Sequence, residues 1–167
     1  MKLMSVPETA EKIKSMEIRG AGRIARAAAE ALRDLALSLD VKDLPAFTAE
    51  MERAAELLVA TRPTAVSLPN AVHIVMNGLD RAKDTESARS GLVQRADGFI
   101  RSSRHAVENI AQFGARHIRD GDTILTHCNS EVALGCIIEA HRSGKDIEVF
   151  ATEVRPRNQG HITIRTL

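Results

Sequence analysis

A single cysteine lies where the sequence predicts that a short strand gives way to a helix. The segment His-Cys-Asn-Ser at residues 127–130 follows a β-branched run and precedes a helical pattern. Free backbone N–H groups and the helix dipole at such a position favour a thiolate, so the pattern predicts a reactive thiol at Cys128. A buried, inert thiol fits the position equally well. That His127 is adjacent to Cys128 in the sequence does not make it the base for this thiol, because neighbouring side chains diverge in an extended chain.

Three arginine-bearing segments have the composition of anion sites. Arg-Gly-Ala-Gly at residues 19–22 precedes a predicted helix and would offer a guanidinium and backbone N–H groups to a phosphate. Spacing alone slightly favours a glycine-rich turn with a solvated Arg19. Arg62 follows a predicted helix end, where an arginine more often interacts with the helix dipole. The segment 155–160 carries two arginines after the second predicted strand, and arginines in such loops are usually solvated.

The elements that must position these residues fall into two regions. Apolar residues at helical spacing predict helices over about residues 5–16 and 22–39, after Pro45, near Pro69 and over 84–119. Glycines at 91, 98 and 114 are points where the last helix could kink or break. We therefore expect an all-α domain over residues 1–120. Cys136, inside a later predicted helix, is expected to be a packing residue.

From residue 121 the pattern becomes strand, helix, strand, helix. The expected elements are strands 123–126 and 147–152 and helices 131–141 and 160–167, a βαβα order that implies a parallel sheet. Ligands of such sheets bind beyond the carboxyl ends of the strands, here residues 127–130 and 153–160. Two strands do not make a stable parallel sheet. We expect either that another chain completes it or, preferably, that the 167 residues are the amino-terminal portion of a longer protein.

Composition narrows the classes of function. The 167 residues contain 23 Lys and Arg against 22 Asp and Glu, and this balance argues against direct nucleic-acid binding by bulk charge. With four Phe and no Tyr or Trp, base-stacking surfaces are not expected. The sequence has neither an apolar run of about 20 residues nor a signal-peptide pattern. Two cysteines eight residues apart form neither a disulfide framework nor a zinc pattern, so we expect a protein of the reducing cytoplasm without a metal.

Four motifs, taken together and in order, carry a specific resemblance. They are Met-Glu-Ile-Arg-Gly-Ala-Gly from residue 16, Thr-Arg-Pro-Thr-Ala-Val from 61, Thr-His-Cys-Asn-Ser from 126 and Thr-Glu-Val-Arg-Pro-Arg-Asn-Gln-Gly from 152. The chain resembles the superfamily of methylthioribose-1-phosphate isomerase, ribose-1,5-bisphosphate isomerase and the regulatory subunits of translation initiation factor 2B. The resemblance covers the whole chain but only the amino-terminal half of a typical member. It implies a helical domain, residues 1–120, an incomplete Rossmann-like α/β domain, residues 121–167, and a homo-oligomer of two or more chains.

Segments 18–26 and 62–70 look most like ribose-1,5-bisphosphate isomerase. That resemblance implies a sugar-phosphate substrate, an aldose–ketose isomerisation and no cofactor, with Cys128 as proton acceptor. The proton donor of the family, an Asp further along, has no match within the 167 residues, so we expect this piece alone to be inactive. The residues implied to surround the sugar phosphate are Arg19, Gly20, Ala21, Gly22, Arg62, Ser130 and Gln159.

Other functions remain open on the sequence. Cys128 and Gln159 favour an isomerase, because the initiation-factor subunits usually lack this cysteine and replace the motif that contains the glutamine. The main alternative is a non-catalytic regulatory subunit that binds a translation factor or a sugar phosphate. A methylthioribose-1-phosphate isomerase and a free-standing helical assembly module are the others.

Overall fold

The computed structural model describes residues 4–167, whose contacts divide the chain into two compact units. Unit 1 ends at Ser103 and unit 2 comprises Arg104–Leu167. The division falls inside one long helix, α5 (Thr85–His117), which contributes its first turns to unit 1 and its last turns to unit 2. The expected domain boundary near residue 120, just beyond this helix, stays a prediction.

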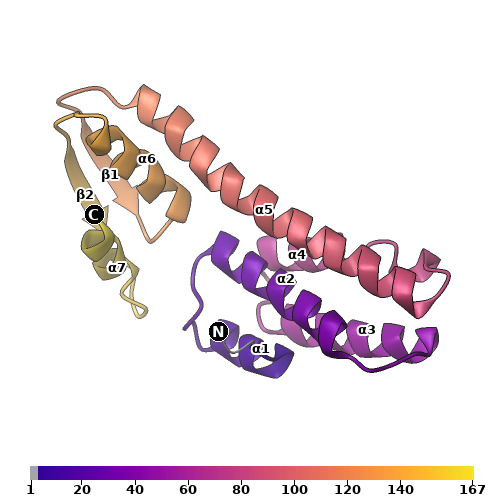
Figure 1. The fold of residues 1–167 in the computed structure, drawn as a ribbon. Helices are drawn as coiled ribbons and strands as arrows, with labels where there is room; N and C mark the ends of the chain where they lie inside the picture. Colours follow the sequence, from indigo (N-terminus) through magenta and orange to yellow (C-terminus); the bar gives the residue numbers. More distant parts are fainter. Residues whose placement is uncertain (1–3) are drawn as a thin grey trace. The chain divides into compact units, whose positions relative to one another are not determined.

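Over residues 4–103, the regular elements of unit 1 are all helices. Its elements are α1 (Val6–Lys14), α2 (Ala21–Ser38), α3 (Leu44–Ala60), α4 (Ser67–Met76), the short 3-10 helix η1 (Leu79–Arg81) and the first part of α5 (Figure 1). The helix α2 packs against α1, α3 and α4. These helices lie where the apolar stripes predicted them, because each stripe needs a neighbour that removes it from water. The largest fully buried apolar side chains are Phe47, Ile13, Leu32, Met51, Leu58, Leu68, Leu92 and Val75.

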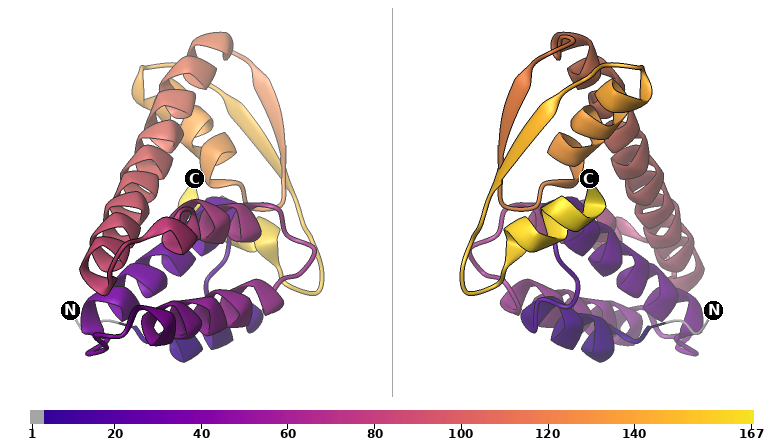
Figure 2. Two further views of the ribbon diagram at one scale, coloured as in Figure 1. Left: turned by 90° about the vertical axis from the view of Figure 1, so that its right-hand side faces the viewer. Right: turned by 90° about the vertical axis from the view of Figure 1, so that its left-hand side faces the viewer.

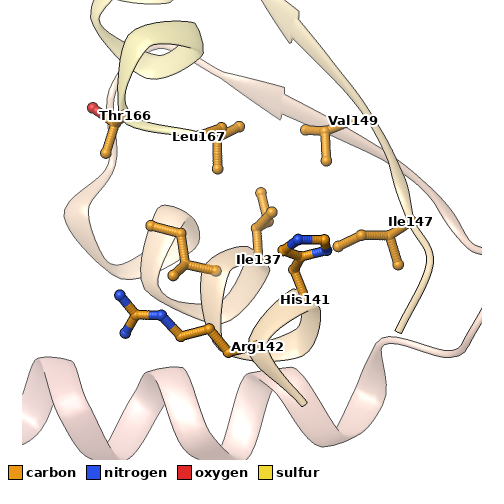
Figure 3. Close-up of a pocket in the computed structure, with 8 residues that line it drawn as sticks. Ile137, His141, Arg142, Ile147, Val149, Thr166 and Leu167 are labelled. Carbon is orange, nitrogen blue, oxygen red and sulfur yellow. The ribbon is translucent and has the colours of Figure 1, made fainter. Parts of the chain in front are cut away.

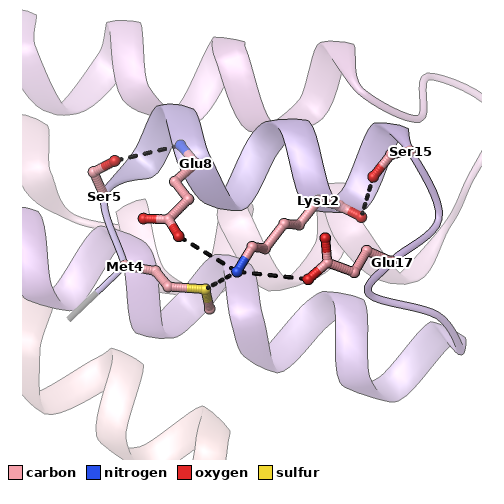
Figure 4. Close-up of polar contacts among 6 residues, drawn as sticks. All are labelled: Met4, Ser5, Glu8, Lys12, Ser15 and Glu17. Atoms are coloured by element: carbon pink, nitrogen blue, oxygen red, sulfur yellow. Dashed lines mark hydrogen bonds and ion pairs between the residues drawn. The ribbon is translucent and has the colours of Figure 1, made fainter. Parts of the chain in front are cut away.

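Polar contacts at α1 determine how the chain leaves this helix (Figure 4). Ser5 caps the helix by accepting a hydrogen bond from the Glu8 N–H at 3.3 Å. The Lys12 ammonium lies 3.3 Å from the Glu8 carboxylate and 3.6 Å from that of Glu17. The hydrogen bond to Glu8, followed by the charge of Glu17, raises the pKa of Lys12 above its ordinary value. Lys12 therefore ties α1 to the segment that leads into Arg19.

The helix α5 runs unbroken for 33 residues, so the glycines at 91, 98 and 114 do not interrupt it. One glycine in a helix costs only about 1 kcal/mol, which neighbouring contacts offset. Within unit 1, Asp97 on α5 accepts a hydrogen bond from Arg33 of α2 at 3.0 Å. Arg89 of α5 donates to the Ala36 carbonyl and, at 2.9 Å, to that of Leu39, which satisfies the carboxyl end of α2.

Unit 2 has the predicted βαβα order after the end of α5. Its elements are β1 (Thr123–His127), α6 (Glu131–Arg142), β2 (Glu148–Thr152) and α7 (Gln159–Thr166). The two strands pair in parallel, from Thr123 opposite Glu148 to His127 opposite Thr152, and α6 lies along one face of the pair (Figure 2). The parallel sheet is thus confirmed. That it begins a larger Rossmann-like domain stays a prediction.

The helix α6 packs against the last turns of α5 through small residues (Figure 1). The Cys136 thiol donates to the Ile110 carbonyl at 3.4 Å, and a methyl group added at Gly114 would lie 2.3 Å from the Cys136 sulfur. Cys136 therefore packs between helices, as expected. The opposite face of the sheet presents Leu125 and Phe150, which are 73% and 54% exposed. Among residues 4–167, no helix has the length and apolar character of a membrane span.

Two glycine-to-alanine changes in α5 test this packing. An added methyl group at Gly98 meets no atom within 4 Å, so Gly98→Ala should raise the free energy of unfolding by about 0.5–1 kcal/mol. Gly114→Ala should instead lower it by about 1 kcal/mol, because the methyl group overlaps Cys136. Adding Cys136→Ala should recover most of that loss. Urea denaturation measures all three, and equal stabilisation by the two alanines would contradict the α5–α6 contact.

Candidate functional site

The carboxyl ends of β1 and β2 lie side by side at one edge of the sheet. The register pairs His127 with Thr152, the last residue of each strand, and His127 Nδ1 lies 2.6 Å from Thr152 Oγ1. The segments 128–130 and 153–158 therefore leave the sheet at the same edge, the place where open α/β sheets bind ligands. Two of the motifs that the sequence singled out are brought together here.

Cys128 has a left-handed backbone that its surroundings hold in place. Its φ is 63°, which is uncommon for a residue with a Cβ. The Cys128 carbonyl accepts a hydrogen bond from the Thr163 hydroxyl at 2.6 Å, and that hydroxyl accepts one from Asn129 Nδ2 at 3.1 Å. Ser130 is the N-cap of α6, and its hydroxyl accepts from the Ala133 N–H at 3.3 Å. The half-buried Cys128 thus lies two residues before the N-cap of α6.

The second segment brings α7 close behind β2. Gln159 begins α7 and is only 7% exposed. A methyl group added at Gly160 would lie 2.6 Å from the Thr152 carbonyl oxygen, so the approach requires a glycine. The Glu153 carboxylate accepts hydrogen bonds from the N–H groups of Val154 at 2.7 Å and His161 at 3.1 Å. The first turn of α7, with Gln159, is thereby attached to the end of β2.

In unit 1, Met16 joins the two arginine segments that the sequence singled out. The Arg19 guanidinium donates to the Met16 carbonyl, and Arg62 Nη1 lies 3.3 Å from the Met16 sulfur. Gly20, with a φ of 85°, is the N-cap of α2, and no side chain caps that helix. The first N–H groups of α2, which include those of Ala21 and Gly22, therefore follow Arg19 directly. Arg19 and Arg62 are close enough to share one contact residue.

Left-handed backbone marks three of the predicted segments. In the described part of the chain, the residues other than glycine with a φ in this region are Met16, Cys128 and Asn158. Such a conformation costs about 1–3 kcal/mol and persists where surrounding contacts enforce it, which is common at functional sites. Sequence reasoning did not single out Met16 or Thr163. For Thr163 a signal existed, because it follows Gln159 by one helical turn and so shares its face.

One cavity of unit 2 does not coincide with the predicted residues. It has a volume of about 420 Å³ and lies among α6, β2 and the end of the chain (Figure 3). Among residues 4–167, no group of three or more His, Cys, Asp or Glu side chains is placed to hold a metal ion. The residues that line the cavity are Ile137, Ile138, His141, Arg142, Ile147, Val149, Thr166 and Leu167.

The two cysteines should differ in reactivity toward an alkylating agent. Cys128 is in a loop before α6, whereas Cys136 packs against α5 and donates to the Ile110 carbonyl. Brief treatment of the folded chain with iodoacetamide should therefore label Cys128 at least several-fold faster than Cys136. Peptide mass spectrometry measures both rates in one sample. Equal protection of the two thiols would contradict an accessible, reactive Cys128.

Comparison with known proteins confirms the resemblance that the motifs predicted. Residues 17–167 match the model of the Initiation factor 2 subunit family. A protein from Methanocaldococcus jannaschii named ribose 1,5-bisphosphate isomerase is 54% identical over 162 residues, which are 97% of this chain and 51% of that protein. A relative of the same name from Thermococcus kodakarensis is 48% identical over 166 residues, 97% of this chain and 52% of that protein.

A solved structure supports the fold. The structure titled as translation initiation factor eIF-2B from Pyrococcus horikoshii OT3 superposes with a TM-score of 0.82 at 30% identity, and the match covers 97% of this chain and 55% of that one. The chain thus spans about half the length of the curated relatives that it matches. The match of the family model to residues 17–167 shows that this chain belongs to the initiation factor 2 subunit family.

Proposed function

We propose that this chain is the amino-terminal portion of a sugar-phosphate isomerase that converts ribose 1,5-bisphosphate into ribulose 1,5-bisphosphate. The observation that carries the proposal is the position of Cys128, at the carboxyl end of β1 and before the N-cap of α6, in a chain 54% identical to a relative named for this substrate. Relatives named for methylthioribose-1-phosphate are more distant, at 36% and 37% identity. Identity therefore favours the ribose bisphosphate.

This isomerisation requires both a base and an acid. Because phosphate occupies the anomeric oxygen, the sugar ring cannot open to a free aldehyde. A base takes the proton from C2, the C–H electron pair forms a C1–C2 double bond, and the bond from C1 to the ring oxygen breaks while an acid protonates that oxygen. The resulting enol phosphate gains a proton at C1 and loses one from the C2 hydroxyl, which leaves a ketone at C2. A thiolate is a suitable base for the first step.

Each candidate residue has a proposed part in this reaction. Cys128 accepts the proton from C2. Arg19 and Arg62 bind phosphate oxygens, with the first N–H groups of α2 beside Arg19. Gln159, on the first turn of α7, hydrogen-bonds the sugar phosphate. Ser130, which the resemblance places beside the sugar phosphate, also caps α6, the helix whose amino end follows the thiol. The resemblance assigns the acid to an Asp outside the 167 residues.

We further propose, on the same resemblance, that the enzyme is a homo-oligomer of the reducing cytoplasm and needs neither metal nor organic cofactor. The regulatory-subunit alternative has one observation in its favour, the close superposition on the structure titled eIF-2B. It predicts no turnover, and binding of an initiation factor that is indifferent to Cys128.

Substitution of Cys128, the proposed base, distinguishes an isomerase from a regulatory subunit. In a full-length version of the protein, Cys128→Ser should abolish isomerisation and leave substrate binding nearly intact, because the hydroxyl is close in size to the thiol but far too weakly acidic to supply a base near neutral pH. Turnover and calorimetric binding of ribose 1,5-bisphosphate measure the two effects. A wild-type protein that binds an initiation factor but does not isomerise the sugar would refute the proposal.

Removal of the phosphate-binding charges should affect binding. Arg19→Ala and Arg62→Ala should each raise KM by about 10- to 150-fold, because each removes a charge-assisted contact to phosphate. Arg53→Ala is the matched control, since Arg53 is an exposed arginine of α3 that pairs with Glu50. Steady-state kinetics of the full-length version measure the KM of each variant. If all three alanine variants kept the wild-type KM, neither arginine would bind the substrate.

A further inference from the structure

We propose that Thr163 is a positioning residue for Cys128, an inference that rests on the proposed function. Thr163 lies on α7, 35 residues after Cys128 along the chain, and is completely buried. Its hydroxyl donates to the Cys128 carbonyl at 2.6 Å and accepts from Asn129 Nδ2 at 3.1 Å. One buried hydroxyl therefore holds the backbone of the residue with the proposed base and the side chain of the next residue.

The Thr163 hydroxyl both donates and accepts a hydrogen bond within the protein. A threonine hydroxyl has one hydrogen to donate, and here it goes to the Cys128 carbonyl, while a lone pair accepts from Asn129. Because the Thr163 side chain is fully buried, water does not readily replace it. Loss of the hydroxyl would leave the Cys128 carbonyl and the Asn129 amide without these partners.

This contact fixes the direction of the thiol. With a φ of 63°, Cys128 has a backbone conformation that a residue with a Cβ seldom adopts unless other contacts enforce it. The bond from Thr163 holds the peptide plane after Cys128 and so opposes relaxation to negative φ. Such relaxation would swing the Cβ and the sulfur, and a displacement of about 1 Å costs a reaction about 100-fold in rate.

Thr163 also links the base to the predicted substrate-binding helix. Gln159 lies one turn earlier on α7, and both side chains are on its buried face. The close approach of Gly160 to the Thr152 carbonyl holds the same turn against β2. Thr163 therefore makes the Cys128 segment and the start of α7 move as one piece.

Valine and serine at position 163 test the role of the hydroxyl in the full-length version. Thr163→Val has nearly the same shape without the hydroxyl, and it should lower kcat by about 10- to 100-fold with KM changed less than about twofold. Thr163→Ser keeps the hydroxyl and should restore kcat to within about threefold of wild type. Thr166→Val is the matched control, because the Thr166 hydroxyl on the same helix donates to the Ile162 carbonyl; its kcat should not change.

A second readout in the 167-residue chain does not depend on turnover. The rate of Cys128 alkylation, divided by that of Cys136 in the same molecule, should fall at least threefold in Thr163→Val and recover in Thr163→Ser. If Thr163→Val does not fold, Asn129→Ala, which removes only the weaker bond to the hydroxyl, should lower the same ratio and kcat to a smaller degree.

The outcomes distinguish a failure of the proposed isomerase activity from a failure of the positioning role of Thr163. A wild-type protein without turnover refutes the isomerase, and the alkylation ratio then still tests the contact. A wild-type protein with turnover, together with an unchanged kcat in Thr163→Val, overturns the positioning role of Thr163. An alkylation ratio that is unchanged or raised in Thr163→Val overturns it as well.

Discussion

The candidate site of unit 2 depends on the parallel pairing of β1 with β2. Its register ends both strands level, with His127 opposite Thr152, so the segments that follow leave the sheet at one edge. A shift of the register by one residue would turn one strand's side chains to the other face and separate these ends. The helix α6 supports the pairing from one face, and its small-residue contact with α5 at Gly114 fixes where that support lies.

Strained backbone at the candidate segments is compensated by contacts from elsewhere in the same unit. The carbonyl of Cys128 is held by Thr163 of α7, and Met16 is in contact with both Arg19 and Arg62. In both cases a left-handed residue contacts a side chain that is distant along the chain, Thr163 for Cys128 and Arg62 for Met16. This arrangement holds polar and charged groups in place before a ligand arrives, which is the usual requirement for selective binding and catalysis.

The sequence predicted the elements better than the contacts between them. Apolar stripes located the helices, and β-branched runs located both strands and hence the strand-end position of Cys128. That α5 continues without a break was not predictable from its sequence. Its glycines disfavour a helix, and the contacts that offset their cost, such as the bond from Arg33 to Asp97, come from the tertiary structure. The contacts of Met16 and Thr163 join residues 46 and 35 positions apart along the chain, and no local pattern reveals such partners. The spacing from Gln159 indicates only that Thr163 shares its face of α7.

The proposed function requires that the segments beyond β1 and β2 bind the sugar phosphate. Hydrogen–deuterium exchange of a full-length version, measured by mass spectrometry with and without ribose 1,5-bisphosphate, tests it most directly. We expect slower exchange on ligand addition in peptides that cover residues 126–133 and 153–163, because the substrate would restrain both segments. Unchanged exchange in both peptides at saturating ligand, or slower exchange confined to the cavity around His141, would contradict it.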